Sequence, residues 1–233
     1  MNYLFFDLEF ASCKGGYHKI CEFGYALTDE AFTLIERGNL MIDPLIGRGE
    51  WDFYALRKII KRKISDFTSE PPFARRYETI LSLFDQSTYA FGHSTVGDVQ
   101  ALNQECKRFS LPPLRFSFFD LAEFYKKHTQ SKNQRALTAI LSDLSVSGDE
   151  NAHNAEADAY NTMLGVKEIL KRESETTFRE APVEAFEVFL SKYGIAPRKS
   201  ETISPEPHRK RSRSGSRRRQ NEKRETASKN SAE

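Results

Sequence analysis

Asp7 and Glu9 stand two residues apart in the apolar segment NYLFFDLEFA. Residues i and i+2 of a β-strand point to the same face, so this spacing projects both carboxylates to one side of a strand. Two negative charges beside a hydrophobic core are costly unless a cation lies with them. Taken alone, the pair is better explained as two solvated acids at the end of a strand.

Two later motifs change that balance. In GHSTVGDVQAL, Asp98 follows His93 by five residues at a strand-to-helix junction, and in AHNAEADAYNTML, Asp158 follows His153 by five residues at the start of a helix. An acid in the first turn of a helix is common, because the helix dipole stabilises it. Four carboxylates in one site, however, are the oxygen ligands that Mg²⁺ and Mn²⁺ prefer, and two such ions can hold the attacking and leaving oxygens of a phosphoryl transfer.

The segments FDLEF, GHSTVGDVQAL and HNAEADA resemble the three exonuclease motifs of the DEDD superfamily of 3′-5′ exonucleases, the DnaQ-like group. The similarity in motif order and spacing extends from residue 3 to about residue 172. A histidine five residues before the last acid, here His153, marks the DEDDh branch, whereas the DEDDy branch carries a tyrosine at the position of Asn154. The resemblance implies a ribonuclease H-like fold and metal-dependent removal of nucleoside 5′-monophosphates from the 3′ end of DNA or RNA.

The resemblance also implies a role for each site residue. Asp7, Glu9 and Asp158 would ligate one divalent ion, Mg²⁺ or Mn²⁺, and Asp7 would also reach a second ion held by Asp98. His153 would be the general base that removes a proton from the attacking water, a task that suits an imidazole at neutral pH. All five residues are therefore expected to be catalytic.

Contacts to the substrate are less defined, because the chain departs from the family where many members carry threonine after the motif glutamate. Phe10 and Ala11 occupy that stretch, and His93 matches the Gly-His of the second motif. These three residues are the candidates for substrate binding. A core position for Phe10 and a structural role for His93 are the alternatives, and Glu22 in ICEFGYAL is expected to be structural.

The elements that must position these residues follow from the apolar patterns. Strands are expected over 2–11, 19–29, 34–43, 88–93 and 115–120, and helices over 52–64, 73–86, 96–109, 120–128, 134–144, 155–172 and 182–194. A meander followed by strands that alternate with helices predicts an α/β fold, a ribonuclease H-like mixed five-stranded sheet flanked by helices, in one domain over residues 1–195.

Composition excludes several classes of protein. The chain has 233 residues, of which 39% are hydrophobic and 29% charged, which is typical of a globular protein. No apolar run is long enough to span a membrane and no secretory signal opens the sequence, so a cytoplasmic location is expected, or a nuclear one in a eukaryote. The three cysteines lack the spacing of a structural zinc site or a disulfide framework.

Residues 196–233 are expected to form a disordered basic tail. From residue 198 onward this segment holds 12 basic and 5 acidic residues and no aromatic residue. A flexible array of cations would bind phosphates without reading sequence, and the candidates for such a nucleic-acid tether are Arg209, Lys210, Arg211, Arg213, Arg217, Arg218 and Arg219. A solubilising tail or a nuclear-localisation signal is the alternative. The basic segment ALRKIIKRKI, residues 55–64, either lines a groove for nucleic acid or presents a solvated face.

Two further functions stay open beside the exonuclease. The chain could be a nucleic-acid-binding or partner-docking module that acts mainly through its basic tail, or a proofreading or processing subunit directed by a polymerase or processing complex. Single-stranded DNA or RNA 3′ ends are the expected partners, and a homodimer is possible. The choice between DNA and RNA depends on contacts to the 2′-hydroxyl, which the sequence does not place.

Overall fold

The computed structural model describes residues 1–12, 17–150, 154–177 and 182–206. Its core is a single mixed sheet with the strand order β3-β2-β1-β4-β5-β6. The strands are β1 (Asn2–Ser12), β2 (Lys19–Asp29), β3 (Leu34–Met41), β4 (Tyr89–Gly92), β5 (Ser117–Asp120) and β6 (Arg198–Lys199). β1 is central: it pairs antiparallel with β2 and parallel with β4, and β5 continues the parallel part of the sheet.

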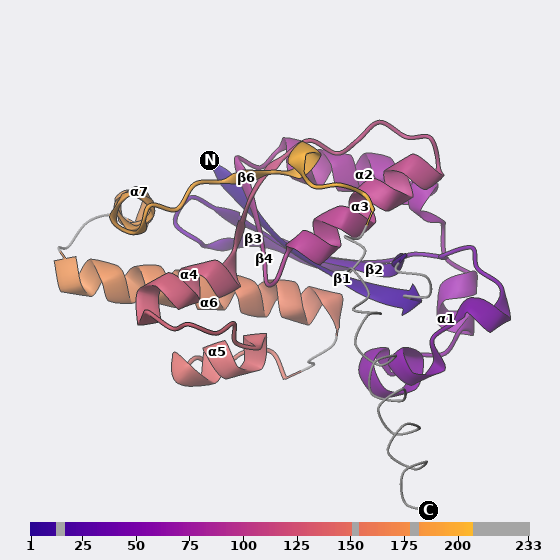
Figure 1. Cartoon of the computed structure of the whole chain (residues 1–233), viewed down its shortest axis with the longest axis horizontal. Coiled ribbons are helices and arrows are strands. Elements are labelled where there is room, and N and C mark those ends of the chain that lie inside the picture. Colours follow the sequence, from indigo (N-terminus) through magenta and orange to yellow (C-terminus); the bar gives the residue numbers. More distant parts are fainter. Residues whose placement is uncertain (13–16, 151–153, 178–181, 207–233) are drawn as a thin grey trace, which may run out of the picture.

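Helices cover both faces of the sheet, which gives three layers (Figure 1). The helices are α1 (Ser65–Thr68), α2 (Phe73–Asp85), α3 (Val96–Arg108), α4 (Leu121–Thr129), α5 (Leu137–Asp143), α6 (Ala155–Thr177) and α7 (Pro182–Tyr193). In Figure 1, α2 and α3 lie above the sheet, and α4, α5 and α6 lie below it. This is the predicted ribonuclease H-like α/β architecture.

Alternation along β1 divides its side chains between the two layers. Tyr3 and Phe5 pack with residues of α4, α6 and α7 in one hydrophobic cluster, whereas Leu4, Phe6 and Leu8 pack with residues of α2 and α3 in another. A strand buried on both faces reads as a nearly continuous apolar run, which explains the sequence NYLFF. Because helices pack on both faces of β1, the acids of this strand, Asp7 and Glu9, must face a neighbouring element instead of open solvent.

The segment between β3 and α2 differs from its prediction. A helix is expected over 52–64, but the structure forms a π-helical segment, Ala55–Ile60, which ends where Lys61 adopts a left-handed conformation. Leu56 and Ile60 are buried with Trp51 and Phe67 in a third small cluster that also contains Ala11 of β1. This cluster attaches the segment to the end of β1.

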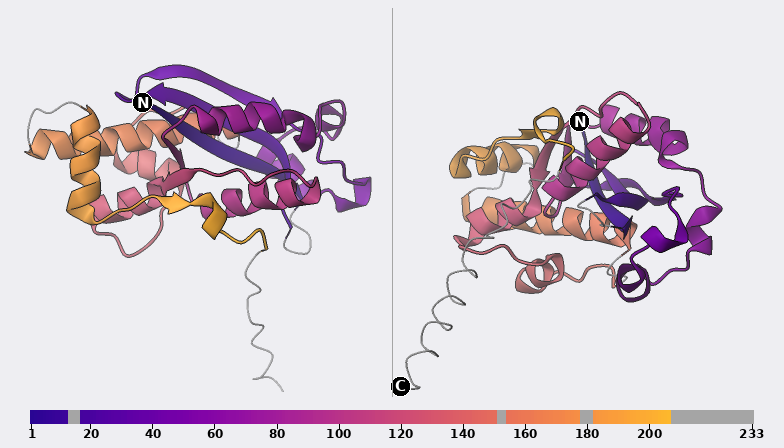
Figure 2. Two further views of the ribbon diagram at one scale, coloured as in Figure 1. Left: turned by 90° about the horizontal axis from the view of Figure 1, so that it is seen from above. Right: turned by 45° about the vertical axis from the view of Figure 1, so that its right-hand side comes forward.

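The sheet has six strands rather than the predicted five. Arg198 and Lys199 pair antiparallel with Phe118 and Ser117 at the edge of β5, and in Figure 2 the segment that follows α7 runs along the sheet toward α3. Two residues are too short a strand for alternation to reveal, and the charged sequence around them favoured a tail. The expected disorder of the tail beyond Glu206 concerns residues outside the described part of the chain.

Two other findings concern the chain as a whole. Among the described residues, no helix is both long and apolar enough to cross a membrane. Cys21 and Cys106 are buried free thiols, and Cys13 lies outside the described residues.

Candidate active site

Asp7, Glu9 and Asp158 converge on one point beside the sheet. Each offers a carboxylate oxygen, and these oxygens all lie within 4.8 Å of one another. Asp7 and Glu9 project from the same face of β1, as the spacing predicts, and Asp158 comes from the first turn of α6. Residues 151 positions apart in sequence are thus brought into one cluster by the packing of α6 on the sheet.

The close seating of α6 depends on Gly24. Gly24 lies opposite Asp7 across the β1–β2 pair, and a Cβ atom on Gly24 would lie only 1.9 Å from the carbonyl carbon of Ala155. The absence of a side chain therefore lets the first turn of α6 contact the backbone of β2 directly.

Two polar contacts fix this end of α6. Asn154 caps the helix, because its side-chain oxygen accepts hydrogen bonds from the backbone N–H groups of Glu156 (3.1 Å) and Ala157 (3.2 Å). Arg37 of β3 forms an ion pair with Glu156 at 3.0 Å. The helix is therefore held at its start, where Asp158 lies, as well as along its apolar face.

Asp98 approaches the cluster from α3. It lies in the first turn of that helix and is 7% exposed. It is close enough to Asp7 that its charge raises the pKa of Asp7. The fourth acid of the predicted set therefore flanks the other three instead of joining their tight group.

Asp120 stabilises the turn that leads into α3, a role that was not among the predictions from the sequence. Its carboxylate accepts hydrogen bonds from the backbone N–H groups of Ser94 (2.9 Å) and Thr95 (3.1 Å), and also from that of Ala122 (2.9 Å) at the start of α4. Ser94 has a positive φ of 58°, a conformation that benefits from such support. The helix N-cap pattern in FFDLAEF is a signal for Asp120, but only for its local role.

The electrostatics of the cluster favour a cation. Burial, followed by the charges of Asp98, Asp158, Glu9 and Glu22, raises the pKa of Asp7 well above its ordinary value. Burial and the charges of Glu22 and Asp158 raise the pKa of Glu9 to about 8. Only Glu9 of the three clustered acids is buried, whereas Asp7 and Asp158 are partly exposed. Crowded carboxylates that repel one another in this way are stabilised by a divalent ion, and their hard oxygen atoms suit Mg²⁺ or Mn²⁺. The residues present therefore fit a metal site.

A buried ion pair borders the cluster. Glu22 lies opposite Glu9 in the β1–β2 register and its side chain is fully buried. Its two oxygens accept hydrogen bonds from Arg62 (2.5 Å) and from the Asn39 side chain (2.6 Å). Arg62 belongs to the segment 55–64, for which the sequence suggested a groove or a solvated face, so one cation of this segment points inward to Glu22 instead.

The other predicted site residues are placed as follows. Phe10 packs in the α2–α3 cluster, on the face opposite Glu9, with its ring 4.6 Å from that of His18. Ala11 is fully buried. Nε2 of His93 contacts the carbonyl oxygen of Arg135 at 2.9 Å. His153 and the proposed tether residues 209–219 lie outside the described part of the chain.

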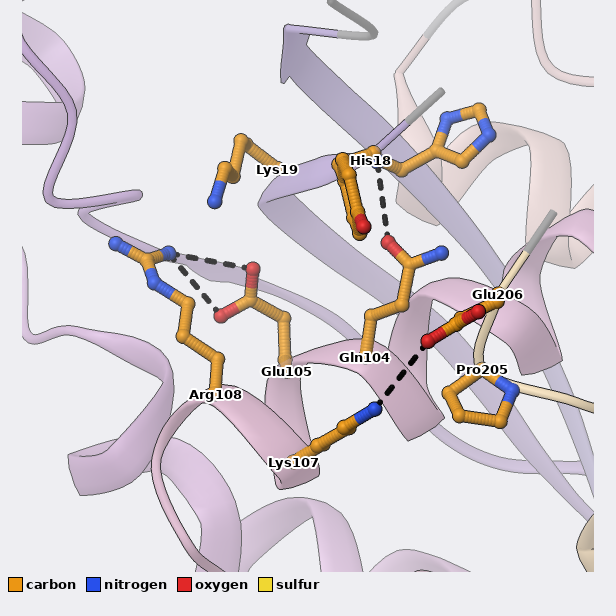
Figure 3. Close-up of a pocket in the computed structure, with 9 residues that line it drawn as sticks. His18, Lys19, Gln104, Glu105, Lys107, Arg108, Pro205 and Glu206 are labelled. Carbon is orange, nitrogen blue, oxygen red and sulfur yellow. Dashed lines mark hydrogen bonds and ion pairs between the residues drawn. The ribbon is translucent and has the colours of Figure 1, made fainter. Parts of the chain in front are cut away.

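A separate pocket of about 390 Å³ opens between α3 and the start of β2. Figure 3 shows Lys107 of this pocket paired with Glu206, and Arg108 paired with Glu105. Tyr17 and His18 complete one wall. None of the clustered acids lines this pocket, so it is a feature distinct from the candidate metal site.

The sequence matches a known protein family. A family model described as RNase_T, exonuclease, matches residues 4–164, which is more than half of the chain. No curated protein sequence gives a significant match to the chain.

Solved exonuclease structures share the fold at low sequence identity. The nuclease domain of 3′hExo, a DEDDh family member, bound to rAMP, aligns with a TM-score of 0.65 and 15% identity over 77% of this chain and 96% of that chain. E. coli exonuclease I in complex with a dA16 oligonucleotide aligns with a TM-score of 0.60 and 20% identity over 75% of this chain, but only 42% of its own. Exonuclease X in complex with 5′ overhanging duplex DNA gives 0.53 and 13%, over 79% of this chain and 97% of that chain. At these identities the likeness establishes the fold alone.

Proposed function

Because the chain belongs to the RNase_T exonuclease family, we propose that it is a metal-dependent 3′-5′ exonuclease of the DEDDh branch. Its substrate is the single-stranded 3′ end of DNA or RNA, from which it releases nucleoside 5′-monophosphates. The observation that carries the proposal is the convergence of Asp7, Glu9 and Asp158 within 4.8 Å, with Asp98 at their side. Such a group has no structural use that would offset the repulsion among its charges.

Two divalent ions, Mg²⁺ or Mn²⁺, are the proposed cofactors. Asp7, Glu9 and Asp158 would hold one of them, and Asp7 and Asp98 the other. When bound, such ions activate a water molecule and neutralise the charge that develops on a phosphodiester during in-line displacement.

The protein's own contribution is to hold these ligands and to move a proton. The contact of Gly24 with Ala155 seats Asp158 against β1, and Asp120 fixes the turn before Asp98. His153 is proposed to take the proton of the attacking water on a ring nitrogen. The bond between the phosphorus and the 3′-oxygen of the penultimate nucleotide would then break, so that the terminal nucleotide leaves with its 5′-phosphate and the shortened strand takes up a proton to end in a 3′-hydroxyl.

Degradation of matched single-stranded DNA and RNA, labelled at either the 3′ or the 5′ end, tests the proposal. Wild type is expected to shorten both labelled strands from the 3′ end with Mg²⁺ or Mn²⁺ and not with EDTA. Asp7→Asn and His153→Ala are expected to lose this activity by at least about 100-fold. Glu123→Gln on α4, an exposed acid outside the cluster, is the matched control and is expected to retain it.

The same assay separates the enzyme from the alternatives. If wild type cleaves neither strand with any metal, but binds both, the proposal is wrong and the chain acts as a binding module. Cleavage that persists in Asp7→Asn would instead contradict the assigned site.

A further inference from the structure

The segment between β3 and α2 presents aromatic and cationic side chains next to the candidate active site. Phe53 and Tyr54 are 40% and 71% exposed, which is unusual for large aromatic residues in this chain. Four cations of the same segment are exposed as well: Arg57, Lys58, Lys61 and Lys63. We call this surface, formed by these six residues, the aromatic–basic platform.

Two contacts hold the platform beside the acids. The backbone N–H of Asp52 donates a hydrogen bond of 2.9 Å to the carbonyl oxygen of Ala11, two residues beyond Glu9 on β1. Arg62 binds Glu22, which faces Glu9 across the β1–β2 pair. Figure 1 shows the segment beyond the arrowhead of β1, at the end of the sheet where α6 begins. Glu9 and Ala11 are two residues apart on β1, a span of about 7 Å. Since Asp52 binds Ala11 and directly precedes Phe53, the platform begins within the length of a few nucleotides from the candidate site.

The backbone conformation at Lys61 separates Arg62, which points inward, from the exposed cations of the segment. Lys61 has a left-handed conformation, with φ 57° and ψ 36°, where the π-helical turn ends. The chain reverses there, so that Arg62 turns inward to Glu22 while Lys61 and Lys63 stay exposed. None of the four exposed cations forms an ion pair with a described residue. The Arg57 guanidinium lies over the Phe53 ring, 5.9 Å from its centroid, so one of the cations already stands against one of the platform's aromatic rings. The charges of the four side chains are not neutralised by an acid of the described residues and can contact a ligand.

The chemistry of the platform matches one class of ligand. Exposed rings next to unpaired cations bind single-stranded nucleic acid, because bases stack on the rings while phosphates contact the cations. An acidic protein partner would use the cations but would not require the rings. Paired bases in a duplex are not free to stack on them either.

Resting on the proposed function, we propose that the platform binds the single strand upstream of the nucleotide being removed. Phe53 and Tyr54 stack on unpaired bases of that strand, and Arg57, Lys58, Lys61 and Lys63 contact its phosphates. The platform thereby gives the enzyme its preference for single-stranded ends and for substrates longer than a dinucleotide.

Binding in EDTA, where no hydrolysis occurs, gives the first test. The probe is a fluorescein-labelled oligothymidylate of about 12 nucleotides, within the range of single-strand site sizes. Phe53→Ala/Tyr54→Ala is expected to raise its Kd about tenfold or more, and Tyr54→Phe in the wild-type background is expected to preserve affinity. Arg57→Ala/Lys58→Ala is expected to weaken binding and to lower the slope of log K against log salt by about 2. Lys126→Ala/Lys127→Ala, the same charge change on exposed positions of α4, is the matched control.

The outcomes differ between a nucleic-acid site and a general anion site. If removal of the rings leaves the Kd unchanged while removal of Arg57 and Lys58 raises it, the platform is only a polyanion surface and the proposal is wrong. It is also wrong if the α4 control weakens binding as much as Arg57→Ala/Lys58→Ala does, or if wild type does not bind the probe. Thermal midpoints equal to that of wild type establish that each variant is folded.

Turnover gives a second test that separates this inference from the proposed function. The p-nitrophenyl ester of thymidine 5′-monophosphate occupies only the terminal site, whereas the oligothymidylate also reaches the platform. The ratio of kcat/KM for the oligonucleotide to that for the ester is expected to fall about tenfold in Phe53→Ala/Tyr54→Ala and to stay unchanged in the α4 control. An unchanged ratio in the aromatic variant overturns the inference. If wild type hydrolyses neither substrate, the proposed function fails, and the binding measurements still decide on the platform.

Discussion

Gly24 of β2 and Ala155 of α6 are in direct backbone contact, so close that a Cβ atom on Gly24 would lie 1.9 Å from the carbonyl carbon of Ala155. This contact sets the distance between the helix that carries Asp158 and the strand that carries Asp7 and Glu9. The cluster of acids therefore depends on a residue that has no side chain.

Gly24→Ala is expected to displace the start of α6 and to separate Asp158 from its two partners. We expect the free energy of unfolding to fall by about 1–3 kcal/mol, as for overpacked cores, and exonuclease turnover to fall at least about tenfold more than the loss of folded protein explains. Denaturant unfolding and turnover per folded molecule measure the two effects. Gly47→Ala is the control, since a Cβ there meets only the Glu50 side chain at 3.9 Å. Equal activity of the two variants would contradict this role for Gly24.

The proposed metal site predicts a change in thermal stability that can be measured without an activity assay. Saturating Mg²⁺ or Mn²⁺ binds the folded state alone and is expected to raise the thermal midpoint of wild type by several degrees. Asp7→Asn is expected to abolish that shift. Without metal, in EDTA, Asp7→Asn is expected to unfold at a higher temperature than wild type. The substitution removes one of several carboxylates that repel one another. A metal-induced shift that survives in Asp7→Asn would show that the ions bind elsewhere.

The Glu22–Arg62 pair predicts an asymmetric double-mutant cycle. Arg62→Met leaves the fully buried Glu22 carboxylate without its cation, and it is expected to lower the free energy of unfolding by about 1–3 kcal/mol. Glu22→Gln/Arg62→Met is expected to recover much of that loss, since an uncompensated buried charge is costlier than a missing pair. Urea unfolding of both variants checks this, and a double variant less stable than Arg62→Met would exclude it.

Much of the fold and of the candidate site could be predicted from the sequence. The i, i+2 spacing of Asp7 and Glu9 gave their shared face, because β1 is a regular strand up to Glu9 and its register shifts only beyond it. The acids at positions 98 and 158 each lie in the first turn of a helix whose apolar pattern is clear in the sequence. Patterns of this kind depend on local geometry, which a sequence records directly.

The features that were missed depend on contacts between distant segments. Asp120 reads as an ordinary helix cap, and its bonds to Ser94 and Thr95 arise only because β4 and β5 are neighbours. Arg62 reads as one of several surface cations, and only the left-handed turn at Lys61 directs it to Glu22. No periodicity in the chain marks either relationship.

Glu173 predicts how stability depends on pH. Burial alone raises its pKa, but hydrogen bonds from Lys192, His128 and Tyr193 outweigh burial and hold the pKa below its ordinary value of 4.5. A carboxylate with a lowered folded-state pKa contributes stability that is fully present above its unfolded pKa and is lost as pH falls through the folded one. Glu173→Gln is therefore expected to be less stable than wild type by about 1–3 kcal/mol at neutral pH.

The difference between wild type and Glu173→Gln is expected to shrink as pH falls below 4.5. Urea unfolding at a series of pH values from neutral to acidic measures it. Glu206→Gln, which removes an exposed ion pair with Lys107, is the control and is expected to change stability little at any pH. A difference that is constant with pH would contradict the assignment to the Glu173 charge.

The edge strand β6 predicts where the chain tolerates truncation. Ser200 is fully buried; its hydroxyl donates to the carbonyl oxygen of Leu114 (2.8 Å) and accepts from the N–H of Phe116 (2.9 Å). A chain that ends at Pro197 loses these bonds and leaves β5 as an open edge, so we expect a loss of about 2 kcal/mol or more and a tendency to aggregate. A chain that ends at Glu206 is expected to keep the stability of the full chain. Equal unfolding midpoints for the two would refute the structural role of β6.

The pocket between α3 and β2 has a consequence for inhibitor discovery. This cavity has a volume of about 390 Å³ and a wall of charged and aromatic side chains, none of which belongs to the cluster of acids. His18 lines the cavity, and its ring lies 4.6 Å from that of Phe10, the residue that follows Glu9 on β1. A compound bound in this pocket would therefore lie apart from Asp7, Glu9 and Asp158, and an inhibitor directed at the candidate active site would instead have to reach those carboxylates themselves.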